Sequence, residues 1–139
     1  MRNQFTMQIK DLSHTYNEHT IFNKVNWTLS SGSIYVLLGE SGAGKTTLLN
    51  IIANMLTSTS GEILFFDELN TKREISYKSD LGYLTEYPYL YPFMTPIEMI
   101  DIVGALKGVD EDALKDMTDK WFTVFDLHKY KDKVIDELS

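Results

Sequence analysis

A chain of 139 residues can bury one hydrophobic core of ordinary size and has no room for a second full domain. Apolar residues make up 43% of the sequence and aromatic residues 12%, which excludes an intrinsically disordered protein. The formal net charge of −7 argues against a nucleic-acid partner, because contacts with phosphates require clustered lysine and arginine.

Nothing in the sequence predicts secretion or insertion into a membrane. Residues 1–5 lack the apolar core of a signal peptide, and no apolar run approaches the ~18 residues of a membrane span. There is no cysteine, hence no disulfide and no thiolate metal site, which fits a reducing compartment. A cytoplasmic protein without a membrane span of its own is therefore expected.

The first part of the chain is predicted to form β-strands. Residues 5–9 alternate apolar and polar side chains, which is the pattern of a strand with one buried face. Residues 11–19 are polar and are predicted as a turn region, and residues 21–29 as a second strand. Residues 33–38 form a short apolar run typical of a buried strand. Three side chains should share one face of the second strand: Val25, Trp27 and Leu29.

A phosphate-binding motif follows the predicted buried strand. Residues 39–46 match Gly-x4-Gly-Lys-[Ser/Thr], and residues 47–56 have apolar side chains at helical spacing, with Leu48, Ile52 and Met55 on one stripe. Strand, glycine loop and helix is the context in which this motif binds a nucleoside triphosphate. A dinucleotide fingerprint is excluded because no third glycine follows at the required spacing.

The residue types in the loop explain the chemistry. Glycines allow positive φ and bring backbone N–H groups close to phosphate oxygens, and the start of the following helix favours an anion. Lys45 is expected to reach the β- and γ-phosphates of a nucleoside triphosphate, and the hydroxyl of Thr46 to bind Mg²⁺. The predicted nucleotide-binding residues of this segment are Gly39, Glu40, Ser41, Gly42, Ala43, Gly44, Lys45, Thr46 and Thr47.

Beyond the loop the pattern changes from strand to helix. Residues 62–66 and 81–85 are predicted as short strands, with a polar loop over 67–80 between them. Thr95-Pro96-Ile97-Glu98 is a capping box with proline at the first helical position, so a helix should extend to about Lys107.

A second helix is predicted after the break at Gly108, with Asp110 as its N-cap. Its apolar residues should face inward: Leu114, Met117, Trp121, Val124 and Phe125.

Together these segments resemble the N-terminal portion of the ATP-binding subunit of an ABC transporter. Tyr16 stands where this family has an aromatic residue that stacks on adenine. The segment 60–63 resembles the one after the family's first helix, and 81–86 resembles the Q-loop strand with Glu86 in place of the usual glutamine. The run 91–98 resembles the entry to the helical subdomain. The glutamate at the Q-loop and the aromatic-proline run after it resemble export-type subunits for antibiotics or lipids.

The resemblance implies an α/β fold of the P-loop NTPase class, namely an incomplete ABC-type ATPase core. It would have an N-terminal antiparallel β-subdomain with the phosphate loop over 1–86 and the start of a helical subdomain over 87–139. Leu138-Ser139 resembles the beginning of the family's signature motif, and its second aspartate strand (Walker B) would follow that motif. The 139-residue chain alone is therefore expected to be nearly inactive as an ATPase.

The resemblance also implies cofactors and partners. ATP and Mg²⁺ would be held with help from Thr46 and Glu86, and Glu86 would be a possible Q-loop position in catalysis. A separate transmembrane permease and a second nucleotide-binding subunit would be the partners. The protein would then lie in the cytoplasm at the inner face of the cell membrane, attached through the permease.

Several features have a second interpretation. Residues 63–68 end in Asp67-Glu68 and have the form of a Walker B strand. The alternative interpretation is a strand that simply ends in solvated acids. Tyr16 could be an ordinary tyrosine at a strand end, and Glu86 a surface acid. The three histidines share no metal-ligand spacing and are interpreted as surface residues: His14, His19 and His128.

Two other functions remain open. A small-molecule kinase shares the phosphate loop, although such kinases usually begin with the strand of that loop, whereas here 32 residues precede it. A non-catalytic nucleotide-binding fragment is the other possibility.

Overall fold

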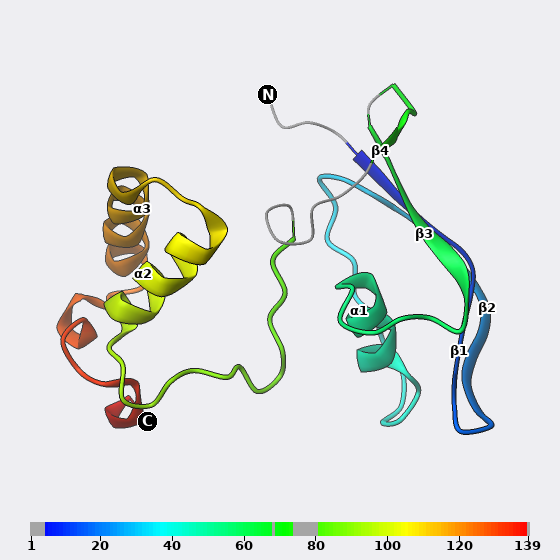
Figure 1. Ribbon diagram of the computed structural model, residues 1–139, viewed down its shortest axis with the longest axis horizontal. Coiled ribbons are helices and arrows are strands. Elements are labelled where there is room, and N and C mark those ends of the chain that lie inside the picture. The colour runs from blue at the N-terminus through cyan, green and yellow to red at the C-terminus, as the bar shows by residue number, and fades with distance from the viewer. Residues whose placement is uncertain (1–4, 68, 74–80, 139) are drawn as a thin grey trace. The chain divides into compact units, whose positions relative to one another are not determined.

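A computed structural model describes residues 5–67, 69–73 and 81–138 of the chain (Figure 1). The chain divides into two compact units, Met1–Gly82 and Tyr83–Ser139. Across the described residues, no helix has both the length and the apolar character needed to cross a bilayer.

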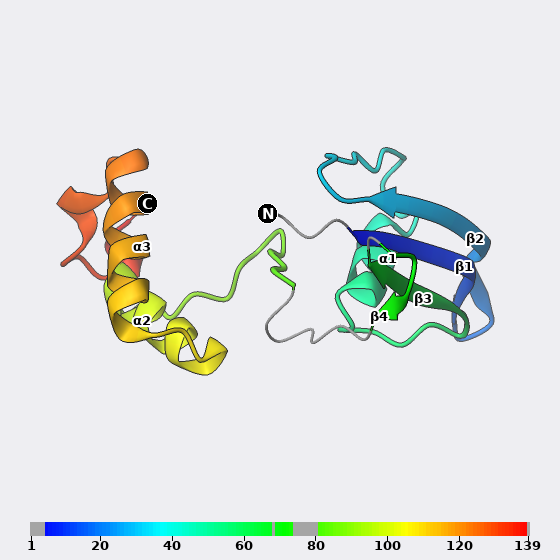
Figure 2. The ribbon, with the colours of Figure 1, turned by 90° about the horizontal axis from the view of Figure 1, so that it is seen from above.

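The described residues of the first unit form an antiparallel sheet with a helix packed on it. Its strands are β1 (Phe5–Tyr16), β2 (His19–Ser30), β3 (Ser60–Asp67) and the short β4 (Lys72–Arg73). Their order in the sheet is β2-β1-β3-β4 (Figure 2). The strands predicted at 5–9, 21–29 and 62–66 are thus present, each within a longer element.

The polar segment predicted as a turn region is mostly strand. β1 continues to Tyr16, and only Asn17 and Glu18, both with positive φ, make the turn into β2. Irregular pairing with β2 follows Ile9, near Asp11, whose φ is 47°. This bulge keeps the later apolar side chains of β1 on the buried face, so pairing along a long hairpin prevails over the local polar sequence.

The core of this unit lies between the hairpin and the helix α1 (Lys45–Ile52). Its buried centre consists of Ile9, Leu12, Leu48 and Ile51. The expected face of β2 is confirmed, since Val25, Trp27 and Leu29 are each partly buried while their neighbours are exposed. Further apolar side chains pack against the centre: Phe22, Leu37, Ile52, Leu56 and Ile63.

The helix after the loop is shorter than predicted. It ends at Ile52 rather than near Leu56, and Asn54 adopts a left-handed conformation just beyond it. Met55, expected on the buried stripe, is largely exposed, and Ile51 takes its place in the core. The register of the buried stripe is set by contact with β1 and β2.

The predicted buried strand before the phosphate loop is not a strand. Residues 33–40 carry no strand assignment, and Ile34 is 96% exposed, with Val36 and Leu38 exposed as well. An apolar run forms a buried strand only when other strands pair with it, and no described strand pairs with this one. The same applies to the predicted strand at 81–85, which is also without strand assignment.

Gly61 explains how β3 can pair closely with β1. Its φ is 85°, and a Cβ atom there would come within 2.5 Å of the Cα of Leu12 and clash with the carbonyl oxygen of Asp11. Only glycine permits both the backbone conformation and the approach. Gly61 of the Ser-Gly-Glu segment is thus a structural requirement of this sheet.

The second unit contains two α-helices. The predicted capping box is confirmed in α2 (Pro96–Lys107): Glu98 N–H donates to Thr95 Oγ1 at 3.3 Å, and Thr95 N–H donates to Glu98 Oε2 at 2.8 Å. Gly108 ends the helix in a left-handed conformation with φ 67°.

The predicted N-cap of the next helix, α3 (Glu111–Val124), is also present. Asp110 Oδ1 accepts a hydrogen bond of 3.1 Å from the N–H of Ala113. Two short 3-10 helices complete the unit, His128–Tyr130 and Ile135–Glu137. The backbone N–H of Ile135 donates to the carbonyl oxygen of Met94 and ties the end of the chain to the start of α2.

The predicted inward face of α3 is wrong in its orientation. Phe122 is buried at 4% exposure, whereas Trp121 is 47% exposed and stacks on Phe125, with ring centroids 5.7 Å apart. Met117, Val124 and Phe125 are exposed too. Leu114 contacts α2 at Gly104, and the buried row continues at every fourth residue through Thr118 to Phe122. The close approach of α2 at Gly104 sets which side of α3 is covered.

Candidate functional site

The phosphate loop ends in an uncapped helix. Gly44 is the N-cap of α1 with φ 85° and ψ 9°, and among the described residues no side chain makes a capping hydrogen bond at this helix start. The first turn holds no acidic residue, and the first helical hydrogen bond runs from Leu48 N–H to the carbonyl oxygen of Gly44. The N-terminal N–H groups and the positive end of the helix dipole therefore favour an anion at this point.

Gly44 is required by packing as well as by its conformation. A Cβ atom at this position would lie 2.5 Å from Cγ2 of Ile21 and 3.3 Å from Cδ1 of Phe22. Side chains at the start of β2 thus pack against the phosphate loop at Gly44. The loop conformation is held by the sheet and not by its own sequence alone.

Lys45 is folded across the loop. Its ammonium group donates hydrogen bonds to the carbonyl oxygens of Gly39, at 2.8 Å, and Glu40, at 2.6 Å. The loop is closed further by a bond from Ala43 N–H to the Glu40 carbonyl oxygen, at 3.2 Å. The positive charge is thereby kept beside the helix N-terminus, where a phosphate oxygen would also lie.

The two threonines that follow differ in exposure. Thr46 is exposed at the beginning of α1, and Thr47 is partly buried. A threonine hydroxyl is a hard oxygen ligand of the kind that Mg²⁺ prefers. The exposed Thr46 hydroxyl is therefore accessible, as a ligand of Mg²⁺ would have to be, and its role at a metal ion stays a prediction.

Tyr16 is linked to the phosphate loop through two aromatic rings. It lies at the end of β1 and is 47% exposed. Its ring packs edge to face with His14, at a centroid distance of 4.5 Å, and His14 lies 6.3 Å from the ring of Phe22. Phe22 in turn lies against Gly44. Tyr16 and the loop are thus connected through His14 and Phe22, and the stacking of Tyr16 on a base stays a prediction.

Glu86 belongs to the other unit of the chain. It is exposed in the segment that leads to α2. Its role at a metal ion stays a prediction.

Asp67 has a structural role in the β3–β4 turn. Its Oδ1 atom accepts hydrogen bonds from the N–H groups of Leu69, at 3.0 Å, and Thr71, at 2.8 Å. Glu68, the other half of the apparent Asp-Glu pair, lies outside the described residues. The geometry of Asp67 supports the simpler interpretation of this segment, a strand that ends in a turn.

One histidine was misjudged from the sequence. His14 is buried at 5% exposure, not on the surface, and neither ring nitrogen has a hydrogen-bond partner among the described residues. The burial of His14 could have been predicted from the alternation that places Leu12, His14 and Tyr16 on the same side of β1. It was missed because this segment was predicted as a turn.

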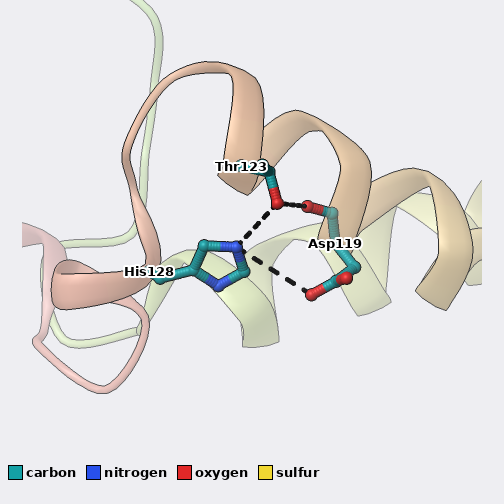
Figure 3. Close-up of polar contacts among 3 residues, drawn as sticks. All are labelled: Asp119, Thr123 and His128. Carbon is teal, nitrogen blue, oxygen red and sulfur yellow. Dashed lines mark hydrogen bonds and ion pairs between the residues drawn. The ribbon is translucent and has the colours of Figure 1, made fainter.

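His128 is exposed, as expected, and belongs to a polar cluster after α3 (Figure 3). Its Nε2 atom lies 3.0 Å from Thr123 Oγ1 and 4.0 Å from Asp119 Oδ1. The Thr123 hydroxyl donates to the carbonyl oxygen of Asp119, at 2.9 Å. The cluster fixes the turn at the C-terminal end of α3.

Comparison with known proteins identifies the family. The ABC transporter family matches residues 22–139, and the chain belongs to this family. It is 33% identical over 137 residues to the bacitracin transport ATP-binding protein BcrA of Enterococcus faecalis, covering 98% of this chain and 43% of that protein. It is 30% identical over 114 residues to the lantibiotic transport ATP-binding protein SrtF of Streptococcus pyogenes, covering 82% of this chain and 48% of that protein. The chain thus spans less than half the length of these relatives.

The fold is shared with solved ATP-binding cassettes. A dimeric cassette in a post-hydrolysis state, bound to ADP and Pi, matches 96% of this chain and 63% of its own, with a TM-score of 0.74 at 19% identity. The fold is therefore that of a P-loop NTPase of the ABC type, as the sequence predicted.

Proposed function

We propose that this chain binds ATP with Mg²⁺ as part of the ATP-binding subunit of an ABC transporter. The observation that carries the proposal is the geometry of the loop: the Lys45 ammonium is held beside a helix N-terminus that no described side chain caps. Three features thus converge on one point, namely backbone N–H groups, a helix dipole and a fixed positive charge.

Each residue of the site has a distinct task. The loop N–H groups and Lys45 would hold the phosphates, Thr46 would be the ligand of Mg²⁺, and Tyr16 would stack on adenine. Bound Mg²⁺ would neutralise the charge on the phosphate oxygens. Lys45 can exchange its two carbonyl acceptors for phosphate oxygens without moving away from the loop, because these acceptors already lie at the loop.

The partners follow from membership of the family. We propose that the subunit acts with a separate transmembrane permease and with a second nucleotide-binding subunit, at the inner face of the cell membrane. The dimeric state of the similar solved cassette supports pairing. Exposed apolar side chains in the second unit, among them Tyr89 and Phe93, are available for contacts with another protein.

We further propose export as the direction of transport and peptide antibiotics as the class of substrate. The names of the bacitracin and lantibiotic transport proteins support this class. Cells that produce the subunit with its permease should grow at higher concentrations of such peptides, and Lys45→Ala should remove the advantage. Equal growth of the wild-type and Lys45→Ala strains in the presence of the peptide, with normal protein levels, would contradict the proposed export.

The nucleotide site itself is tested by titration of the purified protein with MgATP in a calorimeter. Saturable binding by the wild type that disappears in Lys45→Ala is the expected result. The same heat in both proteins would contradict the assignment of the loop.

A further inference from the structure

The imidazole of His14 is an unusual component of the first unit. It is 5% exposed, beside the apolar core, and neither ring nitrogen has a partner within the described part of the chain. A buried polar group without a hydrogen bond costs stability, so its presence calls for a reason other than packing.

The position of His14 suggests that reason. Its ring is perpendicular to that of Tyr16, with an interplanar angle of 85° and a centroid distance of 4.5 Å. The centroid of the His14 ring also lies 6.3 Å from that of Phe22, and Phe22 lies beside Gly44 of the phosphate loop. His14 is thus a neighbour both of the exposed ring at the end of β1 and of a side chain beside the loop.

Tyr16 needs such support because of where it stands. It is the last residue of β1, next to the left-handed turn residues Asn17 and Glu18, and it is 47% exposed. A side chain at the end of a strand has free rotamers unless a neighbour restricts it, and stacking on a base requires one orientation of the ring. An edge-to-face aromatic contact restricts the ring in this way.

We propose that His14 is a positioning residue, whose ring holds Tyr16 in the orientation that stacks on the base of a bound nucleotide. The proposal rests on the proposed function, since it assumes that the loop binds a nucleotide and that Tyr16 meets its base. His14 itself is buried and does not touch the ligand. Its effect should therefore appear only with ligands that carry a base, and only while Tyr16 is present.

The test compares His14→Leu, which removes the ring, with His14→Phe, which keeps a ring but lacks the nitrogens. ATP and inorganic tripolyphosphate are titrated with Mg²⁺ into each variant. His14→Leu should bind ATP about 3- to 10-fold more weakly, in line with the loss of one aromatic pair, and should bind tripolyphosphate as the wild type does. His14→Phe should bind both ligands nearly as the wild type does.

Two further measurements separate positioning from a structural role. Both variants should unfold at the same temperature as the wild type or higher, because the unpartnered buried nitrogens are removed. In a Tyr16→Ala background, His14→Leu should have no further effect on ATP binding. Unchanged affinity in His14→Leu, an equal loss for ATP and tripolyphosphate, or an undiminished effect without Tyr16 would each overturn the proposal. If the wild type bound neither ligand, the proposed nucleotide site would fail first.

Discussion

The ammonium group of Lys45 donates a hydrogen bond of 2.6 Å to the main-chain carbonyl oxygen of Glu40, five residues earlier in the chain. The bond joins the two ends of the phosphate loop and holds the positive charge of Lys45 against the loop backbone. Lys45→Ala removes both the charge and the closure, so we expect MgATP binding to be lost. Lys10→Ala, which removes an exposed lysine from β1, is the matched control and should bind normally. Calorimetric titration of the three proteins decides the matter.

The base contact should depend on an aromatic ring at position 16. Tyr16→Ala is expected to weaken ATP binding by up to about 1–3 kcal/mol, by analogy with bases stacked on aromatic side chains. Tyr16→Phe keeps the ring and should be nearly neutral. An equal loss in both variants would assign the contact to the hydroxyl and rule out stacking.

Replacement of Gly44, at the start of α1, should destabilise the protein more than replacement of Gly42 in the same loop. Gly42 and Gly44 both have positive φ, 82° and 85°, so alanine at either position costs roughly 1–2 kcal/mol in the left-handed region. At Gly44 the new Cβ would also press on Ile21, while at Gly42 no atom lies within 4 Å. Gly44→Ala should therefore lower the unfolding temperature more than Gly42→Ala. Equal thermal stability would show that β2 does not support the loop.

Turnover of ATP by the 139-residue chain alone should remain near the uncatalysed rate. Catalysis of phosphoryl transfer depends on groups that position water and stabilise charge, and Asp67, the one described candidate in the 63–68 segment, is bound to backbone N–H groups of its own turn. Release of phosphate is measured for the wild type, Lys45→Ala and Glu68→Gln. Robust turnover that vanishes in both variants would identify residues 63–68 as a working Walker B strand and favour the kinase alternative.

The second unit should show a local dependence on pH. The hydrogen bond from Lys129 to Asp126, at 2.6 Å, lowers the pKa of Asp126 and raises the pKa of Lys129. Because the folded pKa of Asp126 lies below the unfolded one, its contribution to stability is present above the unfolded value and is lost as the pH falls through the folded pKa. The contribution of Lys129 is present below its unfolded pKa and is lost as the pH rises through the raised one.

A carboxyl titration by NMR checks this pair. In Lys129→Met the pKa of Asp126 should move up toward its ordinary value, whereas Lys131→Met should leave it lowered. An unchanged pKa in Lys129→Met would mean that the pair is not formed in solution.

Features that depend on a few adjacent residues could be predicted from the amino-acid sequence alone. The capping box at Thr95 and Glu98, the N-cap at Asp110 and the stop at Gly108 are all made within one helical turn, so their chemistry is local. The same is true of the phosphate motif and the helix that starts at its end. The family was predicted correctly from this motif taken together with Tyr16 and the segments 60–63, 81–86 and 91–98.

Which faces of the strands and helices are covered depends on contacts that form only in the folded protein. The apolar run at 33–38 resembles a buried strand, but burial requires strands that pair with it, and none of the described strands does. The apolar residues of α3 do not by themselves define which side of the helix is buried. The close approach of α2 at Gly104 buries Phe122 and leaves Trp121 exposed. His14 is buried because the hairpin continues past its predicted end. In each case burial depends on contacts between residues that are distant in the chain. A pattern of adjacent residues cannot predict such contacts.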